Sequence, residues 1–315
     1  MSSSEFEIID RYFKVISRSR EGVVLGPGDD CAVLSFPSDA EVCTSTDTLI
    51  EGVHFPEGAD ASLVASRLVG ANLSDLAAMG AEPHSCLIAL TLAEVDTDWL
   101  GRFSSSLREQ LQRFDMVLIG GNLARGQLSL SMTVIGTVPI GQSVQRQGAK
   151  VGDDIYVTGT LGDAARGLKE LLAGEETDDF LVCRYAEPTP RIEIGMKLRG
   201  LASSMIDVSD GLLADLCHLC EASEVGAIVD LADLPISENL ARALGDSEAR
   251  RQALNAGDDY ELCFTASRGM GPAISAIAKD VGITRIGRIT TDCRLEVTDK
   301  DGLAVTIPDM GYKHF

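Results

Sequence analysis

The chain has 315 residues, of which 45% are hydrophobic, and a formal net charge of -21 at pH 7. This length favours about two domains, and the apolar content is sufficient for folded cores, which excludes a disordered chain. The acidic balance argues against nucleic acid or an anionic membrane surface as a partner, because both require a basic face. An acidic protein that binds a polyphosphate must bring in positive charge, and bound metal ions are the obvious source.

Targeting signals are not evident in the sequence. No apolar run approaches the roughly 18 residues of a membrane span, and the start of the chain lacks the basic residues and apolar core of a signal peptide. We therefore expect a cytoplasmic protein. The eight cysteines are scattered through apolar stretches, which predicts reduced thiols in the core.

An amphipathic helix is the first predicted element. Ser4 and Glu7 fit a capping box, and apolar residues then recur at helical spacing, at Phe6, Ile9, Phe13 and Ile16. Apolar runs next predict strands at 41–46, 85–91, 116–119 and 128–138, and helical periodicity predicts helices at 61–79 and 98–114. The alternation predicts an α/β or α+β fold with a sheet over residues 41–138.

A segment rich in helix and strand breakers, Pro139–Ser143, separates this first half from the second. We place the domain boundary there, with an N-terminal domain at 1–138 and a C-terminal α/β domain at 139–315 that completes the active site. The second half mixes predicted strands at 155–158, 204–208, 260–265 and 285–289 with predicted helices at 161–172, 211–221 and 271–281.

Carboxylates gather in short turns rich in glycine and small residues, at Gly26–Asp30, Ser45–Thr48, Asn72–Asp75, Asp207–Gly211 and Gly257–Glu261. Aspartates with adjacent hydroxyls are oxygen ligands that Mg2+ takes, and Mg2+ in enzymes commonly joins protein carboxylates to substrate phosphates. The pattern predicts phosphate chemistry that uses several metal ions.

Asp75 is the most informative of these carboxylates. On a helix it falls in register with the apolar residues Val64, Leu68 and Ala71, so its charge points toward the core and needs a partner. That partner is a metal ion, a buried salt bridge or a backbone group to be capped. Asp47 ends an apolar strand beside Ser45 and Thr46, which offers three side-chain oxygens from consecutive positions.

Two other acidic turns admit a simpler explanation. Asp29 and Asp30 follow Gly-Pro-Gly, where Asp is a good residue for a hairpin turn. The turn Asp207–Gly211 lies between a predicted strand and a predicted helix, so Ser209 or Asp210 can cap that helix. Free N–H groups at the same helix start would also suit a metal-bound phosphate.

Well-known nucleotide motifs are absent from the sequence. Gly162 and Gly167 have P-loop spacing but are not followed by Lys and Ser or Thr, and the Gly26-Pro27-Gly28 turn lacks the third glycine of a dinucleotide fingerprint. ATP would therefore bind through metals and scattered loops. Arg125, which lies between glycines after an apolar strand, is well placed for phosphate contact.

Taken together, these motifs resemble those of the bacterial thiamine-monophosphate kinases. The resemblance extends from Phe6 to the C-terminus and is carried by Gly28-Asp29-Asp30-Cys31-Ala32, Ser45-Thr46-Asp47-Thr48-Leu49, Gly52-Val53-His54-Phe55, Asn72-Leu73-Ser74-Asp75, Asp207-Val208-Ser209-Asp210-Gly211 and Gly257-Asp258-Asp259-Tyr260-Glu261. It implies the fold of the aminoimidazole ribonucleotide synthetase-like superfamily, a homodimer in which the N-terminal sheets form a barrel, and ATP bound nearby.

The resemblance also implies roles for individual residues. It implies Mg2+ ligands at Asp30, Ser45, Thr46, Asp47, Asp75, Asn122, Asp207 and Asp210. It implies ATP contacts at Gly121, Asn122, Arg146 and Ser209, and contacts to thiamine monophosphate at His54, Asp258 and Tyr312. A carboxylate and an aromatic face suit the aminopyrimidine and thiazolium rings of that substrate.

Two positions depart from the family pattern. Where the family usually has Gly-Gly-Asp-Thr-Thr-Arg-Gly, this chain has Gly120-Gly121-Asn122-Leu123-Ala124-Arg125-Gly126, so a carboxylate becomes an amide and two hydroxyls are lost. Asn122 still offers a carbonyl oxygen to a metal. The second is Asp258, where close relatives often carry Glu, so the charge is kept with a shorter reach.

The resemblance predicts transfer of the ATP γ-phosphoryl group to thiamine monophosphate by alignment and Mg2+ charge neutralisation, without a covalent nucleophile. Two alternatives remain at this stage. One is another ATP-dependent enzyme of the superfamily, such as a selenophosphate synthetase or aminoimidazole ribonucleotide synthetase. The other is a catalytically weakened Mg-nucleotide-binding protein, which Asn122 would explain.

Overall fold

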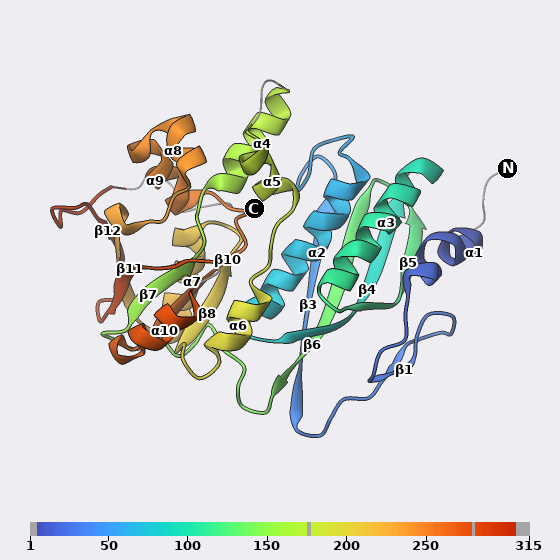
Figure 1. Cartoon of the computed structure of the whole chain (residues 1–315), viewed down its shortest axis with the longest axis horizontal. Helices are drawn as coiled ribbons and strands as arrows, with labels where there is room; N and C mark the ends of the chain where they lie inside the picture. Colours follow the sequence, from blue (N-terminus) through green and yellow to red (C-terminus); the bar gives the residue numbers. More distant parts are fainter. Residues whose placement is uncertain (1–4, 175–177, 279–280, 307–315) are drawn as a thin grey trace. The chain divides into compact units, whose positions relative to one another are not determined.

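The computed structural model describes residues 5–174, 178–278 and 281–306 and has a mixed α/β fold (Figure 1). Two compact units make up the chain. The N-terminal unit comprises Met1–Leu76 and Ala81–Gly141, and the C-terminal unit comprises Ala77–Gly80 and Gln142–Phe315. Each unit is built around its own sheet.

A four-stranded mixed sheet forms the centre of the N-terminal unit, in the order β3–β6–β4–β5. Its strands are β3 (Ala40–Ile50), β4 (Glu82–Leu92), β5 (Val117–Arg125) and β6 (Ser129–Pro139). Strand β6 runs antiparallel to both β3 and β4, whereas β4 and β5 are parallel. A separate hairpin joins β1 (Val23–Leu25) to β2 (Val33–Leu34).

Helices α2 (Ala61–Ala78) and α3 (Thr97–Arg113) lie along one face of this sheet (Figure 1). The two helices contact each other, since the Gln110 side chain donates a hydrogen bond of 3.2 Å to the Ser66 hydroxyl. Helix α3 begins at Asp96, whose carboxylate accepts hydrogen bonds from two backbone N–H groups of the first turn. Apolar periodicity predicted both helices to within one residue of these bounds.

The first helical segment differs from the regular helix predicted there. It consists of α1 (Glu5–Ile8), a π-helical turn η1 (Ile9–Phe13) and a 3-10 turn η2 (Lys14–Ile16). The change of helical pitch rotates the buried face, so the buried residues are Ile8, Tyr12 and Ile16, while Phe6 is 76% exposed. The predicted cap Ser4 lies outside the described residues.

The C-terminal unit contains a six-stranded sheet in the order β12–β9–β11–β7–β10–β8. Its strands are β7 (Asp154–Thr158), β8 (Ser204–Val208), β9 (Gly226–Asp230), β10 (Glu261–Ala266), β11 (Ile283–Thr290) and β12 (Leu295–Thr298). All neighbouring strands are antiparallel except β12 and β9.

The helical elements of this unit are α4 (Asp163–Ala173), α5 (Asp179–Ala186), α6 (Ile192–Leu198), α7 (Leu212–Ser223), η3 (Leu231–Asp233), α8 (Glu238–Leu244), α9 (Asp246–Asn255), η4 (Arg268–Met270) and α10 (Gly271–Ile277). Leucines of α7 pack with apolar residues of β7, β8 and β10 in one buried core. This core fixes the start of α7 directly after the end of β8, where the acidic turn Asp207–Gly211 lies.

Candidate active site

Strand β3 and helix α2 bring the first set of predicted ligands together. The Ser45 hydroxyl donates a hydrogen bond of 2.5 Å to the Asp75 carboxylate. The Asp47 backbone N–H donates to the Asn72 side-chain oxygen at 3.1 Å, and the Asn72 amide in turn donates to the Leu68 carbonyl. Fully buried Asn72 therefore fixes Asp47 relative to α2, one turn of helix before Asp75.

Thr46 lies on the opposite face of β3 from Ser45. Its hydroxyl is 2.7 Å from the Thr133 hydroxyl of β6, and the Thr48 hydroxyl is 2.6 Å from that of Ser131. Consecutive side chains of a strand point to opposite faces. The side chains of Ser45 and Asp47 thus share one face, and the three consecutive oxygens expected from the sequence do not converge on one point.

Asn122 belongs to the same face of the sheet as Thr48. The register pairs Thr48 with Ser131, Ser131 with Ala89, and Ala89 with Asn122. The predicted ligand Asn122 therefore lies within strand β5, separated from β3 by the two strands β6 and β4, and not in the loop that its glycine neighbours suggest.

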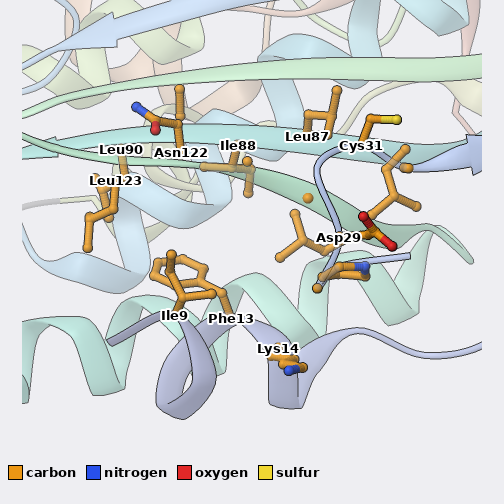
Figure 2. A pocket seen from close by; sticks show the side chains of 18 of the residues that line it. Ile9, Phe13, Lys14, Asp29, Cys31, Leu87, Ile88, Leu90, Asn122 and Leu123 are labelled. Carbon is orange, nitrogen blue, oxygen red and sulfur yellow. The ribbon is translucent and has the colours of Figure 1, made fainter. Parts of the chain in front are cut away.

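A cleft of about 1100 Å3 runs beside β4 and β5 in the N-terminal unit. Figure 2 shows Asn122 and Leu87 pointing to one side of these strands, and Leu123 pointing to the other, toward Ile9 and Phe13. Apolar residues such as Ile88 and Leu118 line most of the cleft, and Gly28–Ala32 of the β1–β2 hairpin line one part of it. A mostly apolar cleft with a few polar groups is typical of a small-molecule site.

Gly121 is required by the close approach of β5 to β4. A Cβ atom at this position would lie 1.9 Å from the Ile88 carbonyl oxygen, which is far inside van der Waals contact. Gly121, which is predicted to contact ATP, is thus also a packing requirement of the parallel strand pair.

Asp30 lies in the exposed loop of the β1–β2 hairpin, as the hairpin-turn explanation of its sequence predicts. Its backbone N–H donates to the Asp29 carboxylate at 2.8 Å, which is a short-range turn interaction typical of Asp. Both aspartates line the cleft described above. They do not share an element with Ser45, Asp47 or Asp75.

His54 follows β3 in a turn. Its Nδ1 accepts a hydrogen bond of 3.0 Å from the Ile50 backbone N–H. The neutral imidazole therefore carries its proton on Nε2. The ring is half-buried, so the turn holds it in a defined orientation.

In the C-terminal unit, the turn Asp207–Gly211 wraps around the side chain of Asp215 from the first turns of α7. Asp215 Oδ2 accepts hydrogen bonds from the backbone N–H groups of Ser209, Asp210 and Gly211, at 3.0, 3.1 and 3.2 Å. Neither Ser209 nor Asp210 caps α7 with its side chain, because the cap residue is Gly211. Of the N–H groups at this helix start, that of the cap residue Gly211 is thus already paired with Asp215.

The second acidic turn, Gly257–Glu261, lies directly against the first. The Asp258 N–H donates to the Ser209 carbonyl at 2.9 Å, and the Tyr260 N–H donates to the Val208 carbonyl at 2.8 Å. A Cβ atom on Gly257 would lie 2.3 Å from the Ser209 oxygen, so only glycine fits there. The structure thus brings Ser209, Asp210 and Asp258 together, as two neighbouring turns.

Asp258 and Tyr260 both have left-handed backbone conformations, with φ of 69° and 52°. This conformation is tolerated by Asp but is uncommon for Tyr, and such strain clusters at functional sites. The Tyr260 hydroxyl donates to the Asp258 carboxylate at 3.1 Å, which orients the predicted substrate contact. Tyr312, the third predicted substrate contact, lies outside the described residues.

Two buried carboxylates of this turn, those of Asp259 and Glu261, hold it to the rest of the C-terminal unit. Asp259 accepts hydrogen bonds from the Gly162 and Ala164 N–H groups at the start of α4, and burial raises its pKa to about 7. Glu261 accepts from Arg184, Arg191 and Thr158. In the segment Gly257–Glu261, the carboxylates of Asp259 and Glu261 thus serve this buried network, and that of Asp258 accepts the Tyr260 hydroxyl.

Arg146 lies in an exposed loop that is tied to the same part of the unit. The Ser223 hydroxyl, in the last turn of α7, donates to the Arg146 carbonyl at 3.1 Å and accepts from the Gly148 and Ala149 N–H groups. The Gln145 carbonyl accepts from the Met205 N–H of β8. The loop is thus fastened to both ends of the β8–α7 segment.

Sequence reasoning assigned no role to the supporting residues of both sets, namely Asn72, Thr133 and Asp215. Asn72 was noted only as part of the segment before Asp75, and the other two lie in runs predicted as strand or helix, where a polar side chain gives no separate signal. The alternating hydroxyls Ser129, Ser131 and Thr133 were the one available hint, since period-two polarity marks the open face of a sheet.

The donor chemistry of each set fits Mg2+ that is completed by phosphate oxygens. Among residues 5–174, 178–278 and 281–306, no three His, Cys, Asp or Glu side chains cluster closely enough to hold a metal ion by themselves. Mg2+ is commonly held by one or two carboxylates together with water and substrate phosphates. The hydroxyl and carboxylates of Ser45, Asp47 and Asp75, and the carboxylates of Asp207 and Asp210, meet that requirement.

Within the part of the chain that the structure describes, no helix is both long and apolar enough to cross a membrane. All eight cysteines are free thiols, but Cys31, Cys183 and Cys293 are exposed, so the expectation that they all lie in the core is wrong in part.

The family models for the AIR synthase related protein match this chain in both halves, with the N-terminal domain model at residues 28–138 and the C-terminal domain model at residues 150–300. The chain is thus a two-domain protein of the AIR synthase related class. It is 46% identical over 322 aligned positions to the thiamine-monophosphate kinase of Escherichia coli K12, an alignment that covers 100% of this chain and 99% of the relative. The chain belongs to the thiamine-monophosphate kinase family.

Solved structures agree with this assignment. The crystal structure of thiamine-monophosphate kinase from Stenotrophomonas maltophilia K279a has a TM-score of 0.87 and 43% identity, over 97% of this chain and 99% of that one. AaThiL in complex with AMPPCP and TMP has a TM-score of 0.80 and 30% identity, over 99% of this chain and 97% of that one.

Proposed function

We propose that the protein phosphorylates thiamine monophosphate to thiamine diphosphate with ATP as co-substrate. The observation that carries this proposal is the match to the E. coli thiamine-monophosphate kinase, which is 46% identical across the full chain. AaThiL, which has the same fold, binds both AMPPCP, an analogue of ATP, and TMP. ATP as co-substrate also fits the cytoplasmic location expected from the sequence.

The proposed reaction needs alignment and charge neutralisation more than proton transfer. The phosphate oxygen of the acceptor is already anionic near neutral pH, so no general base and no covalent nucleophile is required. Bound Mg2+ would join carboxylates to phosphates and offset their charge. The proposed ligands are Asp30, Ser45, Thr46, Asp47, Asp75, Asn122, Asp207 and Asp210.

Among these proposed ligands, Thr46 differs from Ser45 and Asp47 in the face of β3 on which it lies. Its hydroxyl lies beside that of Thr133, so it cannot bind the same ion as the side chains of Ser45 and Asp47. The proposed nucleotide contacts are Gly121 and Asn122, which line the cleft, together with Arg146 and Ser209. The proposed contacts to thiamine monophosphate are His54, Asp258 and Tyr312.

We also propose the homodimer in which two N-terminal sheets form a barrel. Within the described part of the N-terminal unit, β3 is an edge strand of eleven residues with a partly exposed polar face. A long edge strand presents unpaired N–H and C=O groups that favour pairing with another chain. This supports association through β3.

The proposed function is tested with purified protein, ATP, Mg2+ and thiamine monophosphate, by resolving thiamine diphosphate with chromatography. Unphosphorylated thiamine is the control acceptor. Product from the monophosphate alone is expected. ATP binding without any product would contradict the proposed kinase and favour either the weakened binder or another reaction of the superfamily.

Asn122 is the one residue that favours the weakened-binder alternative, because an amide replaces an anionic ligand. The substitution Asn122→Asp separates the two readings. A change in turnover of less than about threefold is expected if the amide oxygen suffices, whereas a gain of orders of magnitude would indicate a crippled site.

A further inference from the structure

We propose that Asp215 is a positioning residue that holds the turn Asp207–Gly211 in the conformation needed to bind metal and phosphate. This inference rests on the proposed function. Asp215 lies inside α7, is 3% exposed, and directs one carboxylate oxygen at three consecutive backbone N–H groups of the turn.

The three hydrogen bonds determine the shape of the turn. Three successive N–H groups can converge on one oxygen only if the backbone of Ser209, Asp210 and Gly211 curves around it. The flanking strand β8 is rigid and fully buried, so this curvature fixes the direction in which the Asp210 side chain leaves the backbone. Three hydrogen bonds to a single acceptor oxygen hold the arrangement in place.

The same turn supports the second acidic turn. The Ser209 carbonyl accepts the Asp258 N–H, and the Gly211 backbone packs against Asn255, where an added Cβ would lie 2.5 Å from the carbonyl oxygen. Any movement of residues 209–211 would therefore reach Asp258, whose left-handed backbone depends on its neighbours. Asp215 consequently positions Asp210 directly and Asp258 indirectly.

A direct role in chemistry does not fit Asp215. Its Oδ2 is surrounded by backbone N–H groups, and the side chain is almost completely buried. The carboxylate also binds the N–H groups of Ser209, Asp210 and Gly211, so these three groups are not open to an external anion. Side chains and metal ions at this turn are then the proposed contacts of the substrate phosphates, and those need defined positions.

The test compares three substitutions that separate position from charge. Asp215→Asn keeps an oxygen near the same place without the charge, Asp215→Glu keeps the charge but displaces it by one methylene, and Asp215→Ala removes both. Leu219→Ala is the matched control, because Leu219 is a fully buried apolar residue of the same helix and makes no hydrogen bond through its side chain to the turn.

Two measurements are made on every variant and on the wild type. The first is hydrogen exchange of the Ser209–Gly211 amides in the metal-free protein. The second is the Mg2+ concentration that gives a half-maximal rate of thiamine diphosphate formation. Exchange is independent of catalysis, and an inactive wild type would refute the proposed function while leaving the exchange result to decide on Asp215.

In Asp215→Ala we expect roughly tenfold faster exchange of these amides, because their acceptor is gone, and a roughly tenfold higher Mg2+ requirement, because the ligands are misplaced. Asp215→Asn should stay within about threefold of wild type in both. Leu219→Ala should lower the melting temperature and leave the Mg2+ requirement unchanged.

The proposal is overturned if Asp215→Ala keeps the wild-type Mg2+ requirement, or if Leu219→Ala raises it equally. It is also overturned if Asp215→Asn resembles Asp215→Ala, since charge would then be the decisive property. If Asp215→Ala does not fold, Asp215→Glu and Asp215→Asn decide. A raised Mg2+ requirement in Asp215→Glu with a near-normal one in Asp215→Asn supports positioning. A near-normal requirement in Asp215→Glu with a raised one in Asp215→Asn contradicts it.

Discussion

At the scale of single residues, the alternation of side chains along β3 decides which groups meet α2. Ser45 and Asp47 face the helix that carries Asp75, whereas Thr46 pairs with Thr133 on the other face. Ser45, Thr46 and Asp47 were grouped in the sequence only because they are consecutive. Substitutions at the adjacent positions 45 and 46 can test whether the two faces of β3 differ in function.

We predict that Ser45→Ala raises the Mg2+ requirement for turnover roughly tenfold, because a hydrogen bond to a charged carboxylate contributes about 1.5–3 kcal/mol. Thr46→Val, which changes the neighbouring residue on the opposite face, should have a smaller effect. Rates measured over a range of Mg2+ concentrations check this. A larger effect for Thr46→Val would show that the proposed metal binds the other face of β3.

We predict that Asp47→Asn and Asp75→Asn each lower turnover by orders of magnitude while the fold stays intact. Each change removes a proposed metal-binding charge but keeps the size of the side chain. At position 75, the Asn side-chain oxygen can still accept the hydrogen bond from the Ser45 hydroxyl. Steady-state kinetics at saturating Mg2+ and far-UV circular dichroism check this. Near-normal rates in both variants would exclude these residues as metal ligands.

Asp259 allows a prediction about pH. Burial raises its pKa in the folded protein to about 7, from an ordinary value of 3.8. Between these values the unfolded chain loses the proton before the folded protein does. The contribution of Asp259 to the free energy of unfolding is therefore full below the ordinary value and is lost as the pH rises through about 7.

Asp259→Asn should consequently remove part of the decline in stability over this pH window. The side chain of Asn resembles the protonated acid and does not titrate. Urea unfolding of both proteins at several pH values across the window checks this. An identical pH dependence in the two proteins would show that Arg184 or another neighbour keeps Asp259 ionised in the fold.

At the scale of secondary structure, period and composition predicted the long buried elements well. Helix α2 was predicted at 61–79 and is found at Ala61–Ala78. Strands β3 and β5 were predicted too short, because Ser45–Asp47 and Gly120–Asn122 interrupt their apolar runs. The polar residues of these strands face either the helix layer or the open face. The apolar pattern therefore stops before the strand itself ends.

Short or polar elements of the second half were not predicted. Helices α8 and α9 are short and largely polar, and β12 has four residues that pair in parallel with β9 through a contact distant in sequence. The candidate site followed the same rule: the acidic turns were recognisable, but the pairing of Ser45 with Asp75 depends on a tertiary contact. The hydrogen bonds of Asp215 are local, but they depend on the exact residue at which α7 begins.

Gly121→Ala tests the close contact between β4 and β5. A methyl group there would meet the Ile88 carbonyl oxygen, so we expect a loss of more than about 2 kcal/mol in the free energy of unfolding. Gly101→Ala is the matched control, because Gly101 lies within α3 with nothing near its missing Cβ, and this change should stabilise by about 0.5–1 kcal/mol.

Denaturant unfolding of both glycine variants gives the two free energies. Opposite signs are expected, although the chemical change is the same. Equal effects at the two positions would mean that β4 and β5 separate easily enough to admit the methyl group.

At the scale of the whole molecule, the proposed homodimer gives a measurable mass. One chain has a mass of 33.5 kDa, and analytical ultracentrifugation should find about twice that value at micromolar concentration. Replacing Val42, an exposed residue of the edge strand β3, with Lys should shift the equilibrium toward the single chain, since charge on an edge opposes strand pairing. A fully active protein with the mass of one chain would contradict the dimer.

The hydroxyl pairs of β3 and β6 also affect how prone the newly synthesised chain is to aggregate. Thr46 with Thr133, and Thr48 with Ser131, satisfy each other's hydrogen bonds on a face that would otherwise be apolar. In the proposed homodimer, a subunit that has not yet paired would therefore expose little apolar surface there. Valine at these four positions would keep the β propensity but favour aggregation of the newly made chain.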